Sequence, residues 1–215
     1  QDAVDEAVST LRAAGAQATG VAADIAVAAD IDRAVASSIE AFGGIDILVN
    51  NAGFIRRSPA VSYSDDDWDA VIEADLTSMF RICRHAGAHM IERGSGRIVN
   101  IASLLSFQGG ITVPAYAAAK GGVAQLTRAL ANEWAGKGVN VNAIAPGLTD
   151  TAQPRYGNTD AELVEMARIT IPLGGKLLTP DQIARTADLM DLQLATFQHL
   201  NHRLNNVLVE NIGGV

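Results

Sequence analysis

The sequence predicts an α/β protein with a doubly wound, parallel sheet in a single domain. Short apolar runs rich in β-branched residues alternate along the chain with longer amphipathic runs, as expected for strands joined by crossover helices. The strand-like runs are apolar over most of their length, which is typical of parallel strands buried on both faces. A length of 215 residues favours one domain.

The expected elements follow the alternation of these runs from the N-terminus. Amphipathic periodicity predicts the helices, and short β-branched runs predict the strands. Glycine-containing stops at 94–96 and 136–138 end the last two helices. A polar loop with a short helix is expected at 147–170, and the pattern is less regular beyond it. In order, we expect a helix at about 1–14, a strand at 18–23, a helix at 28–42, a strand at 45–50, a helix at 66–93, a strand at 96–102, a helix at 114–136 and a strand at 139–145.

Composition and charge argue against several classes of function. The net charge of −8 disfavours nucleic-acid binding, which requires basic patches. No apolar run reaches the ~18 residues that a membrane-spanning helix needs. Cys83 is the single cysteine, so no intrachain disulfide forms, in keeping with a reducing cytoplasm. His199 and His202 have helical spacing but no third ligand nearby, so we expect no metal site.

Tyr116 and Lys120 lie four residues apart in the predicted helix at 114–136 and therefore share one of its faces. A phenol titrates near ~10 and is a poor base at neutral pH. A cation close by favours the phenolate and lowers that pKa. The tyrosine can then exchange a proton with an alcohol or a carbonyl near neutral pH. The alternative is a buried tyrosine beside a solvated lysine.

Two further motifs follow predicted strands. Ser103 ends the apolar run at 97–102, where its hydroxyl faces the crevice in which open α/β sheets bind ligands. It can hold a substrate oxygen there. The sequence Asn50-Asn51-Ala52-Gly53 follows the run at 45–49, and small residues at a strand end let the backbone approach a ligand closely. Taken alone, this second motif also fits an ordinary turn.

Together with Asn142-Ala143-Ile144-Ala145-Pro146-Gly147, these motifs resemble the short-chain dehydrogenase/reductase family over roughly residues 1–183. The resemblance implies a Rossmann-like fold that binds NAD, with NADP possible, and transfers a hydride between nicotinamide and substrate. It implies that Tyr116 is the acid/base, that Lys120 lowers its pKa and holds the nicotinamide ribose, and that Ser103 positions the substrate oxygen. The other implied cofactor-binding residues are Asp24 and Ile25 at the adenine, Asn51, Ala52 and Gly53 on the adenosine side, and Pro146, Gly147, Thr149 and Thr151 near the nicotinamide amide.

Asp75 departs from the family pattern at a catalytic position. The family usually has Asn there, and that Asn helps to hold a water that relays protons from the lysine. An aspartate accepts the same hydrogen bonds but adds a charge. It can pair with Lys120, disturb the proton relay, or take no part in catalysis.

The N-terminal part of the sequence also departs from the family. The sequence opens at Gln1 within a predicted amphipathic helix and contains no G-x-x-x-G-x-G run. A glycine-rich loop at a helix N-terminus is what holds the pyrophosphate of the cofactor. We therefore expect a single dehydrogenase domain at 1–215 that lacks its first βαβ elements and, with them, the residue that selects NAD or NADP.

Arg56, Arg57 and Gln108 suggest the substrate. Their surroundings resemble the sugar-acid dehydrogenases of this family, of the 2-deoxy-D-gluconate 3-dehydrogenase and gluconate 5-dehydrogenase type. Arginine forms paired, charge-assisted hydrogen bonds to a carboxylate, and a glutamine can bind sugar hydroxyls. Alternatively, both arginines are solvated or contact another subunit.

Two other functions stay open at this stage: a reductase for another ketone, such as a 3-oxoacyl thioester, and a non-catalytic fragment that mediates subunit contacts. We also expect a homo-oligomer, a dimer or a tetramer, because the helices at 66–93 and 114–136 carry apolar residues on more than one face. In the helix at 114–136, these apolar residues include Val123, Leu126, Ala129, Leu130 and Trp134.

Overall fold

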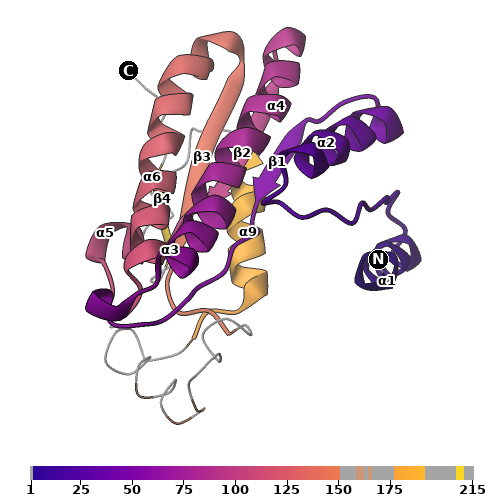
Figure 1. Ribbon diagram of the computed structural model, residues 1–215. Helices are drawn as coiled ribbons and strands as arrows, with labels where there is room; N and C mark the ends of the chain where they lie inside the picture. The colour runs from indigo at the N-terminus through magenta and orange to yellow at the C-terminus, as the bar shows by residue number, and fades with distance from the viewer. Residues whose placement is uncertain are drawn as a thin grey trace.

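The computed structural model describes residues 2–150, 159, 161, 165, 177–191 and 207–210. Within these residues, helices and strands alternate as the sequence predicts (Figure 1). No helix in this part of the chain is long and apolar enough to cross a membrane. The elements are α1 (Asp2–Ala13), α2 (Ala28–Phe42), β1 (Ile47–Asn50), η1 (Ala60–Ser62), α3 (Asp65–Ile72), η2 (Glu73–Thr77), α4 (Ser78–Arg93), β2 (Gly96–Ile101), α5 (Leu105–Gln108), α6 (Pro114–Trp134), η3 (Ala135–Lys137), β3 (Val139–Pro146), α9 (Pro180–Asp191) and β4 (Val207–Glu210).

The four strands form one sheet in the order β1-β2-β3-β4. The first three strands are parallel, with Asn50 opposite Asn100 and Asn100 opposite Ala143. β4 runs antiparallel to β3. The predicted α/β class with a mainly parallel sheet is therefore confirmed, and the carboxyl ends of β1, β2 and β3 meet at one edge.

Helices cover both faces of this sheet (Figure 1). α4 and α6 pack on one face over the largest apolar cluster, which includes Met90, Ile98, Val123 and Trp134. On the other face, α9 packs on β2 and β3 through a cluster that contains Val99, Ile144, Leu178 and Ile183. Ile47 and Val49 of β1 are about half exposed, with 46% and 49% of their surface accessible.

The predicted strand at 18–23 is wrong. Residues 16–24 have no regular secondary structure, and no strand in the described part of the chain pairs with them. An isolated extended segment has no ladder partner for its backbone groups, so the apolar pattern alone does not make a strand. The preceding helix α1 buries none of its residues and lies apart from the sheet (Figure 1).

The single helix expected at 66–93 is instead built from three consecutive segments. Ser64 caps the start of α3, because its hydroxyl accepts a hydrogen bond from the Asp67 N–H at 3.1 Å. The π-helical turn η2 then separates α3 from α4. Single π-helical turns occur frequently at functional sites, and this one carries Asp75.

Candidate active site

The candidate site lies where β1, β2 and β3 end. Backbone hydrogen bonds join the segments that leave these strands: the N–H of Ala102 donates to Ile144 O at 2.8 Å, and the N–H of Leu104 donates to Pro146 O at 3.1 Å. Ser103 therefore lies beside the segment that begins at Pro146. The expected meeting of strand ends at one edge is what brings residues more than forty positions apart together.

Tyr116 and Lys120 are both buried on α6, with 9% and 3% of their surface accessible. Pro114 occupies the first turn of this helix, where its lack of an N–H costs no hydrogen bond. The Lys120 Nζ atom lies 5.6 Å from the centre of the Tyr116 ring and donates a hydrogen bond to Ile101 O at 2.9 Å. Lys120 is therefore buried and hydrogen-bonded rather than solvated. Burial lowers its pKa, while the nearby Asp75 opposes that shift.

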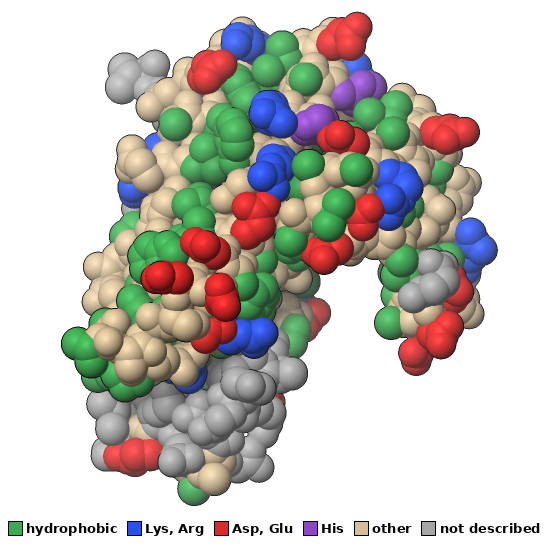
Figure 2. Space-filling model, in the orientation of Figure 1, with side chains coloured by type: hydrophobic (Ala, Val, Ile, Leu, Met, Phe, Trp, Pro, Cys, Tyr) green, Lys and Arg blue, Asp and Glu red, His purple; other side chains and the backbone are tan. Residues whose placement is uncertain are grey.

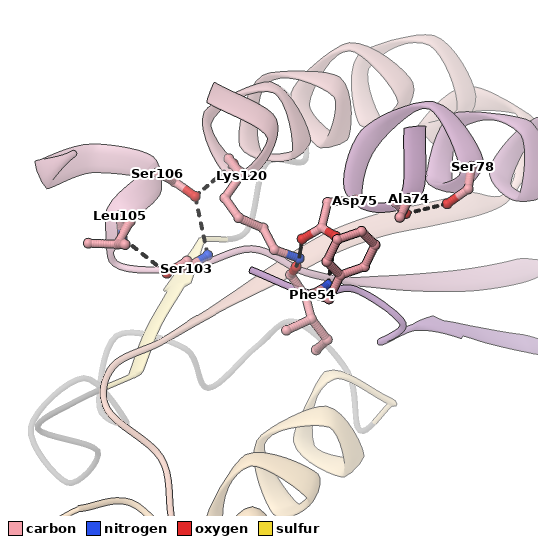
Figure 3. Close-up of polar contacts among 9 residues, drawn as sticks. Phe54, Ala74, Asp75, Ser78, Ser103, Leu105, Ser106 and Lys120 are labelled. Atoms are coloured by element: carbon pink, nitrogen blue, oxygen red, sulfur yellow. Dashed lines mark hydrogen bonds and ion pairs between the residues drawn. The ribbon is translucent and has the colours of Figure 1, made fainter. Parts of the chain in front are cut away.

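Ser103 is held by its neighbours in the turn after β2 (Figure 3). The N–H of Leu105 donates to Ser103 Oγ at 3.1 Å, and the N–H of Ser103 donates to Ser106 Oγ at 3.2 Å. Ser106 Oγ in turn donates to the backbone carbonyl of Lys120 at 2.7 Å. Ser106 therefore ties the Ser103 turn to α6. Our sequence reasoning missed this residue, although a serine three positions after another at a strand end is a signal for such a turn.

Asp75 is fully buried, and it reaches the same site from η2. Its Oδ1 atom accepts a hydrogen bond from the Phe54 N–H at 2.8 Å, and its Oδ2 atom lies 3.5 Å from Lys120 Nζ (Figure 3). Burial raises the pKa of Asp75, and Lys120 and the Phe54 N–H oppose the rise. Of the alternatives left open by the sequence, the structure shows the pairing with Lys120.

A buried polar chain beneath the site was not predicted. Asn50 Nδ2 donates to Asn100 Oδ1 at 2.9 Å, and Asn100 Nδ2 donates to Thr127 Oγ1 at 3.0 Å. This chain ties β1 to β2 and β2 to α6, directly below the strand ends. Cys83 also contacts it, and desolvation by burial raises the pKa of the Cys83 thiol to about 12. An asparagine at the end of each of two neighbouring strands was the available signal.

The predicted cofactor residues that the structure describes lie on segments after the strands, on α6 and in the segment ahead of α2. Asp24 and Ile25 line a pocket of about 780 Å³ together with Phe54 and part of α3. Gly53 passes so close to Asp75 that an added Cβ would lie 2.9–3.0 Å from the carboxylate atoms, so the backbone there leaves room for no side chain. Asn51 and Ala52 follow β1 and are exposed.

On the other side of the site, Pro146, Gly147 and Thr149 form the half-buried segment after β3. Thr149 pairs with Leu178 ahead of α9. Thr151 lies outside the described residues. The pocket beside Asp24 and Ile25 is lined by apolar residues and by three acidic ones, Asp24, Asp69 and Glu73. Apolar residues suit an adenine ring and a carboxylate can bind ribose hydroxyls, so this lining fits that side of NAD(P). The exposed, small residues after β1 fit close backbone approach to the same molecule.

The residues predicted to bind substrate are only partly brought together. Arg56 stacks over the Phe54 ring at 4.9 Å and pairs with Asp67 at 3.5 Å. The N–H of Ser58 donates to Thr112 O at 2.9 Å, which places the exposed Arg57 near the loop that follows α5. Gln108 is the exposed last residue of α5. The described residues hold no ion-pair partner for Arg57.

No group of three or more His, Cys, Asp or Glu side chains in the described residues could hold a metal ion. His199 and His202 lie outside the described residues, as does most of the predicted loop and helix at 147–170.

Comparison with known proteins identifies the class of protein. Residues 1–161 match the family described as short chain dehydrogenase, and the chain belongs to this family. The matched region contains every strand end of the site, together with Tyr116 and Lys120 of α6.

Two relatives with the same name show which individual proteins the chain is similar to. The chain is 56% identical to a 2-dehydro-3-deoxy-D-gluconate 5-dehydrogenase of Pseudoalteromonas atlantica over 62% of this chain and 52% of the relative. It is 44% identical to the Escherichia coli protein of the same name over 79% of this chain and 67% of the relative. The chain thus spans about half the length of the first relative.

A solved structure shows the same fold. It is a gluconate 5-dehydrogenase from Burkholderia cenocepacia in complex with NADP and tartrate, 33% identical, with a TM-score of 0.79 over 85% of this chain and 71% of that chain.

Proposed function

We propose that this chain is an NAD(P)-dependent oxidoreductase that interconverts a secondary alcohol and a ketone on a sugar acid. The observation that carries the proposal is the buried pair of Tyr116 and Lys120 on α6, held beside Ser103 where the strands end. This arrangement supports the proposal, because a proton donor and acceptor, a cation and a hydroxyl would then serve the same substrate. The names of the relatives from two organisms, both 2-dehydro-3-deoxy-D-gluconate 5-dehydrogenases, support the substrate class.

In the proposed mechanism, Tyr116 accepts the proton of the alcohol during oxidation and returns it to the ketone oxygen during reduction. Lys120 supplies positive charge close to the phenol, which favours its ionised form. Ser103 holds the substrate oxygen by a hydrogen bond from its hydroxyl, which the turn with Ser106 positions. When bound, NAD(P) accepts or supplies the hydride.

The cofactor is proposed to lie across the strand ends. Asp24 and Ile25 would hold the adenine side, and Asn51, Ala52 and Gly53 the adenosine. Tyr116 and Lys120 would face the nicotinamide ribose. Pro146, Gly147, Thr149 and Thr151 would meet the nicotinamide. NADP in the related Burkholderia cenocepacia structure supports this cofactor class.

Arg56, Arg57 and Gln108 are proposed to bind the substrate. A sugar acid brings a carboxylate into a partly buried site, and an unpaired charge there is costly. The tartrate in the related structure is a small dicarboxylate, in keeping with such an anion-binding site. We also propose that residues 1–215 belong to one dehydrogenase domain, that the protein acts in the cytoplasm, and that it forms a homo-oligomer, a dimer or a tetramer.

Replacing Tyr116 tests the proposed chemistry. Tyr116→Phe keeps the ring but removes the ionisable hydroxyl, so oxidation of 2-keto-3-deoxygluconate or gluconate with NAD(P) should slow by roughly 10²–10⁴-fold, the usual contribution of general acid–base catalysis. The measurement is steady-state turnover of the full chain, with folding checked by circular dichroism.

Tyr63→Phe is the matched control. Its hydroxyl donates a hydrogen bond to the Arg56 carbonyl at 3.3 Å, and its ring stays in place in the variant, so turnover should change by only a few fold. Equal turnover in the Tyr116→Phe variant and the wild type would overturn the assignment.

A further inference from the structure

The carboxylate of Asp75 is fully buried beside Lys120 and the turn after β1. Its Oδ1 atom accepts a hydrogen bond from the Phe54 N–H, and a Cβ added to Gly53 would lie within 3.0 Å of both carboxylate oxygens. The Oδ2 atom has no hydrogen-bond partner, but it lies 3.5 Å from Lys120 Nζ. Figure 3 shows the two side chains pointing toward one another from η2 and α6. Both side chains are almost completely buried, so no bulk water separates the two charges.

Other charges around the pair are already engaged. Glu73, two residues before Asp75 on the same turn, is bound to Arg81. The segment that precedes α3 offers Asp75 only the backbone N–H of Phe54, since Arg56 pairs with Asp67. From α6, Lys120 and the phenol of Tyr116 face the site; Tyr63 lies in the same apolar cluster. Among the described residues, Lys120 is the charged side chain that Asp75 contacts.

Burial shifts both members of the pair toward their neutral forms. It raises the pKa of Asp75 and lowers the pKa of Lys120, and each partner opposes the shift of the other. The pair can exist as carboxylate and ammonium or as carboxylic acid and amine, and its net charge is zero in both forms. A lysine paired with a neutral asparagine would instead present a full positive charge to Tyr116.

We propose that Asp75 is the buried counter-ion of Lys120 and weakens the pull of that lysine on the Tyr116 proton. Asp75 is then a positioning residue that acts through Lys120, and this role rests on the proposed function of the site. The consequence is a pH range for alcohol oxidation that lies higher than in a chain with asparagine at this position. Reduction, which needs a protonated phenol, is favoured at the pH where oxidation is slowed.

Titration of the phenol tests this proposal without requiring turnover. The chain has three tyrosines, so the Tyr116 signal is the difference in ultraviolet phenolate absorbance between each protein and its Tyr116→Phe version. Asp75→Asn should move the Tyr116 ionisation to lower pH by about one unit or more, within the range that a neighbouring charge produces. Asp66→Asn removes a carboxylate from the exposed start of α3 and is the matched control; it should leave the ionisation unchanged.

A double variant separates the proposed role from a structural one. In a Lys120→Met chain the buried carboxyl has lost its cation, so burial raises its pKa further and less of it carries a charge when the phenol titrates. Adding Asp75→Asn to that chain should therefore move the Tyr116 ionisation less than it does when Lys120 is present. An unchanged midpoint in Asp75→Asn alone, or an equal shift in both backgrounds, would overturn the proposal. If Asp75→Asn does not fold, Asp75→Ser takes its place: it also removes the charge, so a lower Tyr116 midpoint supports the proposal and an unchanged midpoint overturns it.

Activity provides the second readout. In an active chain, the low-pH limb of kcat/KM for oxidation should move down with the phenol midpoint in Asp75→Asn. A shifted titration in a chain that oxidises no sugar acid would refute the proposed function and leave the role of Asp75 intact. Sugar-acid oxidation together with an unshifted titration would refute the role of Asp75 and leave the proposed function intact.

Discussion

The two adjacent arginines after β1 differ in what they already contact. Arg56 is stacked on Phe54 and paired with Asp67, so its guanidinium is partly occupied. Arg57 is exposed, and the described residues contain no ion pair to it. The sequence could not distinguish the two, because the stacking and the ion pair depend on how the loop folds back on α3. We therefore propose Arg57, rather than Arg56, as the residue that meets a substrate carboxylate.

Methionine replacements test this difference, because methionine keeps much of the apolar stem and removes the charge. Arg57→Met should raise KM for a sugar acid by an equivalent of roughly 1.5–3 kcal/mol, the scale of a charged hydrogen bond. Arg56→Met should change KM less. A neutral polyol of similar size serves as control substrate and should be used equally well by both variants. Equal losses on acid and neutral substrates would remove the physical support for a carboxylate-binding arginine.

At the scale of elements, the strands of the site were predictable and their surroundings less so. β1, β2 and β3 were expected from short β-branched runs, and all three form within a few residues of the predicted bounds. The run at 18–23, Ala18-Thr19-Gly20-Val21-Ala22-Ala23, is also short and mostly apolar but contains two β-branched residues and a glycine. It forms no ladder with any strand in the described part of the chain, because pairing also depends on neighbouring strands. The π-helical turn η2 has no periodic signature, so neither its position nor the inward aim of Asp75 could be read from the sequence.

The turn after β1 approaches η2 closely enough to make a mutational test. Gly53→Ala would place a methyl group 2.9–3.0 Å from the Asp75 carboxylate. Asp75 cannot easily move away, because it is held by Lys120 and by the Phe54 N–H. The variant should therefore lose about 1–3 kcal/mol of unfolding free energy, the usual cost of overpacking.

Gly136→Ala is the control for that variant, since an added Cβ there meets nothing within 4 Å. Its stability should match the wild type within ~0.5 kcal/mol, as for surface changes away from special features. Urea unfolding followed by circular dichroism measures both. A Gly53→Ala chain as stable as Gly136→Ala would show that η2 yields easily at this point.

At the scale of the whole molecule, the apolar side chains that are exposed differ from those that the sequence predicts at a subunit interface. Of the five apolar residues cited on α6, Val123, Leu130 and Trp134 are buried in the core and Leu126 packs against it. Ala129 is exposed. Periodicity cannot tell which of two apolar stripes covers the sheet. The large apolar side chains left exposed on α3 and α4 are Trp68 and Phe80, with 40% and 41% of their surface accessible. Figure 2 shows apolar side chains scattered among charged ones on the visible face.

We expect a homo-oligomer that buries this α3–α4 surface. Phe80→Ser removes a large aromatic from it and should lower the molar mass measured by light scattering at micromolar concentration. Phe42→Ser, which replaces a half-exposed aromatic on α2, is the control and should leave the mass unchanged. A wild-type chain that is monomeric, or a Phe80→Ser chain with unaltered mass, would contradict this expectation.

The buried polar chain of Asn50, Asn100 and Thr127 also favours one register of the sheet over others. In the observed register the two asparagines are opposite one another, and the Asn50 side-chain amide donates a hydrogen bond to Asn100 Oδ1. A slip of one residue would set Asn50 beside Val99 or Ile101 and strand its amide in apolar surroundings, at about 1–3 kcal/mol for each unsatisfied group. A misaligned sheet is therefore less stable than the observed one. The two asparagines at the strand ends thus also favour the correct register of β1 and β2 during folding.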